Sequence, residues 1–198
     1  MPKSGISMVI ENYDKCLKDI NALKGKGEKV VSRTVGDFKK RAPGWVSQEV
    51  VKEYNIKKKE ISSSNKGTRK AGSIRVAGVK LDEIALVYRG KLLTPVHFGM
   101  TPKLRPANGK RYTVKATIRK GQKKSLGSMV FLAGAEKNGA VQIPFQRKGG
   151  SRLPIEAVKT VSVPQTITNS KVSEMIYDRI SLELGKRLEH NMKQIFKR

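Results

Sequence analysis

The side chains that most often carry catalysis or bind metals are few in this sequence and lie far apart. His97 and His190 have no Cys, Asp or Glu neighbour at the spacing of a metal site. His97 lies in a proline-containing loop, where we expect a packing or backbone-bonding role, and His190 falls on the solvated face of a predicted helix. Cys16 lies on the apolar face of another predicted helix and is expected to be a small core residue. None of the three residues has the neighbours of a catalytic or metal-binding group.

The carboxylates and glycines likewise form no recognisable site. Asp82 and Glu83 are adjacent and precede a predicted strand, but their spacing to nearby lysines matches no metal-dependent nuclease arrangement. Glu156 and Lys159 are expected to be a surface pair of opposite charges. The phosphate-binding pattern GxxxxGK[ST] is absent. The sequence therefore predicts neither an enzyme nor a bound cofactor.

The strongest chemical signal is the positive charge. The 198 residues carry a formal net charge of +26, with 37% apolar residues. Residues 71–170 contain 18 basic and only 4 acidic side chains, so the excess is not confined to a tail. Such a charge opposes compaction and favours a polyanionic or acidic partner. We expect a basic surface on a folded body.

Two dense basic clusters are candidates to face a nucleic acid. Exposed cations near phosphates release counterions and bind without reading the base sequence. Aromatic residues make up only 6% of the chain and do not alternate with basic ones, so stacking on single-stranded bases is not indicated. A solvated basic surface, or one that meets an acidic protein, is the alternative. The candidate residues are Lys57, Lys58, Lys59, Lys66, Arg69 and Lys70 in the first cluster, and Arg119, Lys120, Lys123 and Lys124 in the second.

The cysteine content and hydropathy indicate a compartment. One cysteine allows no disulfide within the chain, which fits a reducing environment. No stretch approaches the roughly 20 apolar residues of a membrane span, and the N-terminus lacks the layout of a signal peptide. We expect a soluble intracellular product with no membrane partner.

Helical periodicity marks both ends of the chain. Apolar residues at three- and four-residue spacing predict a helix over 5–24 that ends at Gly25, and a second over 28–42 that Pro43 and Gly44 break. A short third helix follows from Ser47, which completes an N-terminal helical part over residues 1–56. A long amphipathic helix is predicted over 171–197.

Between these helices, the sequence predicts a connector and a β-rich body. Residues 57–72 are rich in serine, glycine and basic residues and predict a flexible connector with little to bury. The body, 73–198, contains a proline loop over 93–106, a strand over 83–89 buried on both faces, and an alternating strand over 111–119. Further strands are predicted over 73–76, 129–133 (of a central type), 140–146 and 153–163. The fold class is α+β: a mainly antiparallel sheet packed against N-terminal helices and a long C-terminal helix.

The chain is organised around residues 141–165, which predict a basic-tipped hairpin leading into the last helix. Alternating apolar residues form each strand, and Gly149 and Gly150 allow a tight reversal between them. Because an interior proline cannot donate to a ladder, Pro144 predicts an edge strand or a bulge. Pro164 is expected to end the second strand.

This stretch resembles the hallmark of the phage minor tail protein Z family, also called tail completion proteins. The family pattern combines an apolar strand, a basic glycine-containing turn, an Arg-(Leu/Tyr)-Pro-Ile element, a Ser-Val-Pro-Gln-like stop and a long helix. The matching residues are Phe145, Arg147, Lys148-Gly149-Gly150-Ser151-Arg152, Leu153-Pro154-Ile155 and Ser162-Val163-Pro164-Gln165. Upstream, Ile56–Lys59 and Tyr88–Leu93 follow the family's order, whereas Thr160-Val161 and the longer insert 101–109 depart from it.

The resemblance implies a structural virion protein at the head-proximal end of a long phage tail. Such a protein is expected to form a homo-oligomeric ring, to contact tail terminator or tail tube proteins and head connector proteins, and to surround double-stranded DNA. During assembly it would be in the host cytoplasm. A strand edge such as that of the Pro144 strand could add to a neighbouring subunit's sheet. Candidate assembly residues are Phe145, Arg147, Lys148, Arg152 and Pro154. The alternative function is a stand-alone basic nucleic-acid-binding protein.

Overall fold

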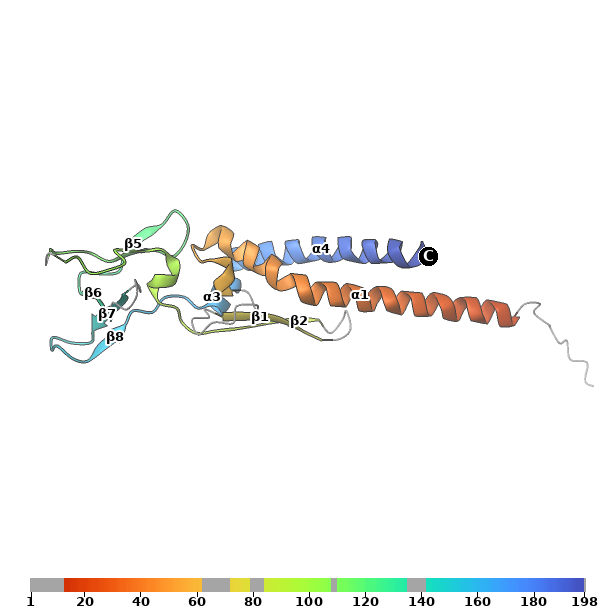
Figure 1. Ribbon diagram of the computed structural model, residues 1–198, viewed down its shortest axis with the longest axis horizontal. Helices are drawn as coiled ribbons and strands as arrows, with labels where there is room; N and C mark the ends of the chain where they lie inside the picture. The colour runs from red at the N-terminus through yellow and green to blue at the C-terminus, as the bar shows by residue number, and fades with distance from the viewer. Residues whose placement is uncertain (1–12, 62–71, 79–83, 108–109, 135–141, 198) are drawn as a thin grey trace, which may run out of the picture.

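The computed structural model describes residues 13–61, 72–78, 84–107, 110–134 and 142–197. Two long helices lie side by side and antiparallel, strands β1 (Gly72–Ala77) and β2 (Ala85–Gly90) run beside them, and the later strands gather at one end of an elongated molecule (Figure 1). The fold is α+β, as predicted. The predicted antiparallel pairing is confirmed, and the described strands divide into three small sheets.

The N-terminal helical part is one helix, α1 (Tyr13–Glu53), so the predicted ends at Gly25 and Pro43 are wrong. Its buried face continues in phase through the proline, from Phe38 and Ala42 to Trp45 and Val50. Proline in a helix interior costs about 3 kcal/mol, because it lacks the N–H and crowds the preceding turn. Packing of this face against the rest of the chain offsets that cost.

The C-terminal helix α4 (Ser170–Phe196) confirms the predicted helix within one residue at each end. It packs against α1 along an apolar seam in which Ile180 and Leu184 contact the cluster of Phe38, Ala42 and Trp45. Further along, the buried Asn191 donates from Nδ2 to Thr34 Oγ1 at 3.2 Å and to Asp37 Oδ2 at 3.3 Å. Apolar and polar contacts therefore hold the two helices together over most of their length.

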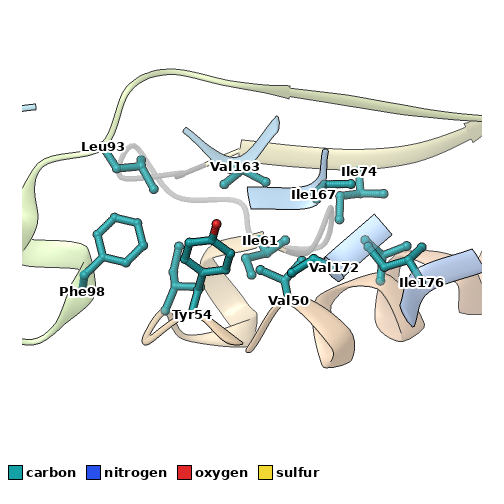
Figure 2. Close-up of a cluster of buried hydrophobic side chains, with 12 residues drawn as sticks. Val50, Tyr54, Ile61, Ile74, Leu93, Phe98, Val163, Ile167, Val172 and Ile176 are labelled. Carbon is teal, nitrogen blue, oxygen red and sulfur yellow. The ribbon is translucent and has the colours of Figure 1, made fainter. Parts of the chain in front are cut away.

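The main core lies where the helices meet the first sheet (Figure 2). Its sheet pairs β1 (Gly72–Ala77) with β2 (Ala85–Gly90). The strand prediction for β2 is confirmed, but its burial on both faces is not, since Ala85 and Arg89 are exposed. Segments from α1 through to α4 contribute buried side chains to this core, which are Val46, Val50, Tyr54, Ile56, Ile61, Ile74, Leu93, Phe98, Val163, Ile167, Val172 and Ile176.

Two segments that were predicted to be loops enter this core. The connector begins with a short helix, α2 (Lys58–Ile61), whose Ile61 is fully buried. The proline loop begins with a 3-10 turn, η1 (Pro95–Phe98), and both Pro95 and Phe98 are buried. The predictions are wrong at residues 58–61 and 95–98, because one or two apolar residues among many polar ones are enough to anchor a short segment.

The remaining strands build the far end of the molecule. One sheet has the order β3 (Met100–Thr101), β4 (Lys115–Thr117), β5 (Lys123–Ser125), and the other has the order β6 (Val130–Ala133), β7 (Ile143–Arg147), β8 (Ile155–Ala157). The alternation predicted over 111–119 is confirmed, with Val114 and Ala116 buried and Lys115 exposed. Met100, Val114, Val130 and Leu132 form a second, smaller core.

The position of Pro144 corrects a prediction. β7 is the central strand of its sheet and β6, predicted to be central, lies at an edge. Pro144 faces Leu132 at a position without a hydrogen bond between the strands, because the Leu132 N–H donates to Tyr112 Oη at 2.9 Å instead. On its other side, the Pro144 carbonyl accepts from the Val158 N–H at 2.8 Å, just past the end of β8. A central strand therefore tolerates this proline.

The predicted hairpin is confirmed, but its second strand is short. After β8, Ser162 caps a helix, α3 (Val163–Ile167), and Gln165 completes a capping box by accepting from the Ser162 N–H. Pro164 lies in the first turn of α3, where its missing N–H costs nothing. Val161 and Val163, predicted to extend the strand, instead lead into this helix.

Candidate nucleic-acid interface and assembly hairpin

The two predicted basic clusters meet where α1 ends. Arg119 forms an antiparallel bridge with Tyr54, the Asn55 N–H donates to the Ile118 carbonyl at 3.0 Å, and the Lys120 N–H donates to the Glu53 carbonyl at 2.9 Å. The second cluster is thereby attached to the residues immediately before Lys57. Clusters about 60 residues apart in the sequence thus become neighbours. We call this surface the basic junction: Lys57, Lys58, Lys59, Arg119, Lys120, Lys123 and Lys124.

All seven side chains of the basic junction are exposed. The Arg119 guanidinium lies over the Tyr54 ring, 5.7 Å from its centroid, which holds one cation in a defined place. Tyr54 itself is buried, and no pattern in the sequence indicated that it would pair with Arg119.

Local structure explains how the junction presents its charges. Burial of Ile61 holds α2 against the core, so the lysines before it remain at the surface. Gly121 turns the chain from β4 to β5 with a φ of 76°, a conformation that favours glycine. The turn places Lys123 and Lys124 on β5, paired with β4.

A shallow surface pocket of about 270 Å³ opens beside the second cluster. It is lined by Ala116, Ile118, Arg119, Gln122 and Lys124, and none of these side chains is acidic. Exposed cations around an open pocket suit phosphate oxygens.

The histidine near the junction has an acidic partner. His97 Nδ1 lies 2.6 Å from Glu60 Oε2, and the His97 N–H donates to the Thr94 carbonyl at 3.1 Å. The bond to Thr94 is made by the main chain of His97, whereas its ring contacts Glu60; this contact was missed because the two residues are 37 positions apart. This pair joins α2 to η1. His190 is exposed on α4, as predicted.

The assembly candidates lie on the β7–β8 hairpin, at the same end of the molecule as β5 (Figure 1). Phe145 is half-buried and stacks on Phe131 with centroids 6.4 Å apart, while the Arg147 guanidinium lies 5.8 Å from the Phe131 centroid. The hairpin strands are therefore tied to β6. Arg152 and Pro154, at the tip, are exposed.

The hairpin presents both charge and apolar surface. Lys148 Nζ pairs with Glu156 Oε2 at 3.2 Å, and Lys159 Nζ lies 3.9 Å from Glu156 Oε1, which confirms the expected surface pairing. Leu153 at the tip is 67% exposed. A surface pocket of about 380 Å³ is lined by residues 146–148 and 156–159. Exposed apolar and charged groups together are typical of a protein contact.

Some predicted residues lie outside the described ranges. These are Lys66, Arg69 and Lys70 of the first cluster, the Asp82 and Glu83 pair, and the side chain of Cys16. Within the described residues, no group of three His, Cys, Asp or Glu side chains is placed to hold a metal ion.

Among the described helices, none combines the length and apolar character needed to cross a membrane. In comparisons with protein-family models, with curated proteins and with solved structures, the chain matched none of them.

Proposed function

We propose that this chain is a structural virion protein of the minor tail protein Z type. It would act as a tail completion protein that forms a ring at the head-proximal end of a phage tail, joins the tail to the head and surrounds the DNA path. The observation that carries this proposal is the meeting of the two basic clusters at one junction. A surface rich in exposed cations suits a wall along which DNA passes without sequence preference.

The helix pair and the β7–β8 hairpin have separate roles in this proposal. The α1–α4 pair forms the rigid body of the subunit, and the β7–β8 hairpin presents Arg152, Leu153 and Pro154 to a neighbour. With β7 in the centre of its sheet, the edge available for strand addition on this hairpin is β8, not the Pro144 strand. The neighbour would be a second subunit, a tail tube protein or a head connector protein.

The first experiment tests assembly. The purified protein is mixed with tail tubes that lack it, and light scattering and electron microscopy follow its mass and its position. The proposal expects a ring at one end of each tube. A protein that stays monomeric in the presence of tubes would overturn it.

A second experiment separates the hairpin from the fold. Arg152→Ala combined with Pro154→Gly removes two exposed groups, so solubility and thermal unfolding should change little while joining of tails to heads falls sharply. The control is Lys159→Ala, at the base of the hairpin, which should leave joining unchanged. Equal losses of joining and of stability in the hairpin variant would indicate a role in folding instead.

The alternative is a stand-alone basic nucleic-acid-binding protein, which the basic junction alone would also support. The discriminating result is tight binding of duplex DNA by a monomer at physiological salt, together with no association with tail tubes.

A further inference from the structure

The outward face of α1 carries a row of cations that becomes visible only when α1 is continuous. Lys18, Lys29, Arg33 and Lys40 are separated by 11, 4 and 7 residues. Each spacing is close to a whole number of 3.6-residue turns, so the four side chains share one face of the helix. All four are exposed, and the face opposite to them packs on α4. We call these four residues the α1 stripe.

The cations of the stripe differ from those of α4 in their partners. On α4, Lys171 pairs with Glu53 at 2.6 Å, Lys186 with Glu183 at 3.5 Å and Lys193 with Glu189 at 2.5 Å. Among the side chains that the structure describes, which do not include those of residues 13–17, 19 and 20, no carboxylate pairs with any member of the α1 stripe. A row of cations with no partner among the described carboxylates is suited to an external polyanion.

The length of the α1 stripe is close to one helical turn of duplex DNA. From Lys18 to Lys40 the helix rises about 33 Å, at 1.5 Å per residue, and one turn of B-DNA spans about 34 Å. The residues between the cations on this face are small, including Ala22, Gly25 and Gly36. A Cβ added at either glycine would meet nothing within 4 Å, so packing inside the chain does not require glycine there. A low surface between the cations lets a phosphate backbone approach the helix closely.

We infer that the α1 stripe is a second DNA-binding surface, distinct from the basic junction, that takes the sugar-phosphate backbone of duplex DNA. This inference rests on the DNA path of the proposed function for the identity of the polyanion. Four phosphate contacts would contribute about −3.6 to the slope of log affinity against log salt, at about −0.9 per contact.

The test compares two variants of equal net charge. In the stripe variant, Lys29, Arg33 and Lys40 become Gln, and in the control variant Lys171, Lys186 and Lys193 become Gln, so each carries 26 − 3 = +23. Glutamine is a good helix former, and all six positions are exposed, so both variants should fold. Binding of a random-sequence duplex of about three helical turns is measured by fluorescence anisotropy across a salt series.

The stripe variant should bind about 100-fold more weakly in about 0.1 M salt and lose about 2.7 from the magnitude of the salt slope, while the control changes little. Equal losses in both variants would show that only net charge matters and would overturn the inference. An unchanged affinity with a lower oligomer mass in the stripe variant would overturn it in favour of contact with a second copy.

The test of the α1 stripe and the test of the tail role can give different results. If the wild-type protein assembles on tail tubes but binds no duplex, the stripe inference fails and the joining role stands. If the protein binds duplex through the stripe but never associates with tubes, the stripe stands and the tail role fails.

Discussion

The two long helices, α1 and α4, pack against each other but owe their helical state to different causes. α4 has one glycine in 27 residues, and its exposed lysines at 171, 186 and 193 pair with carboxylates. α1 contains four glycines and Pro43 in 41 residues. Relative to alanine, these five residues cost on the order of 7 kcal/mol of helix propensity.

The low helix propensity of α1 indicates that this segment is helical because its apolar face packs against α4 and the first sheet. Its apolar face repeats without a break against α4 and the first sheet, and burial of that face offsets the weak local preference. The opposite face is then free to carry small and basic residues. α4, by contrast, has favourable charge pairs of its own.

The largest expected effect comes from breaking the contact between the helices. Phe38 is 3% exposed and packs edge-on against Trp45, with centroids 6.0 Å apart. Phe38→Ala should lower the free energy of unfolding by about 3–5 kcal/mol, because it removes a buried ring and leaves a cavity. Urea denaturation measures the loss. Phe38→Leu is the control and should cost clearly less; a loss below about 1 kcal/mol for the alanine variant would contradict the dependence of α1 on its apolar face.

A smaller loss of stability is expected when the polar contact between Asn191 of α4 and α1 is removed. Asn191→Ala leaves the buried Thr34 hydroxyl and the Asp37 carboxylate without this donor, which should cost about 1–3 kcal/mol. The neighbouring exposed His190→Ala should have almost no effect. Thermal unfolding of the two variants makes the comparison, and equal melting temperatures would show that the apolar seam alone holds the helices together.

A gain is expected where α1 is locally weak. Gly36→Ala should stabilise the protein by about 1 kcal/mol, since a Cβ fits in open space, and should raise the melting temperature by about 2–4 °C. Gly99→Ala is the opposite control, because Gly99 has a φ of 71° and its Cβ would collide with the Asn55 amide. If Gly36→Ala destabilised the protein, the cost assigned to glycine in α1 would be wrong.

The smallest effect concerns a charge pair on α4. Lys193, through a hydrogen bond and its charge, lowers the pKa of Glu189 below its ordinary value of 4.5. Lys193→Gln should return that pKa towards 4.5, as NMR titration of the side chain would show. Because the pKa is lowered in the folded state, any stabilisation is present above the ordinary pKa and disappears as the pH falls through the folded-state value. Both side chains are well exposed, so the melting temperature should hardly change; an unshifted pKa in the variant would show that the pair does not form.

Local patterns predicted the parts of the fold that depend on neighbours in the sequence. The C-terminal helix, the alternation through Val114 and Ala116, and the hairpin of β7 and β8 follow from periodicity and glycine turns. The helical spacing of apolar residues from Phe38 through Ala42 to Val50 is also visible in the sequence, but Pro43 and Gly44 favour a helix break at the same place.

Other features depend on partners far away along the chain. Pro144 is tolerated in a central strand because it faces Leu132 at a position without a hydrogen bond and because β8 ends beside it. Glu60 contacts His97, and Arg119 contacts Tyr54, across sequence separations that are too long for any local pattern to predict.

By itself, the sequence determined the α+β class, the terminal helix, the basic-tipped hairpin and the presence of two basic clusters. Only the tertiary structure decided that these clusters meet at one junction and that α1 runs unbroken with its cations on one face. The physical reason is that propensity and periodicity act within a few residues. Burial of Ile61, Phe98 and the apolar face of α1 depends on segments that only folding brings together.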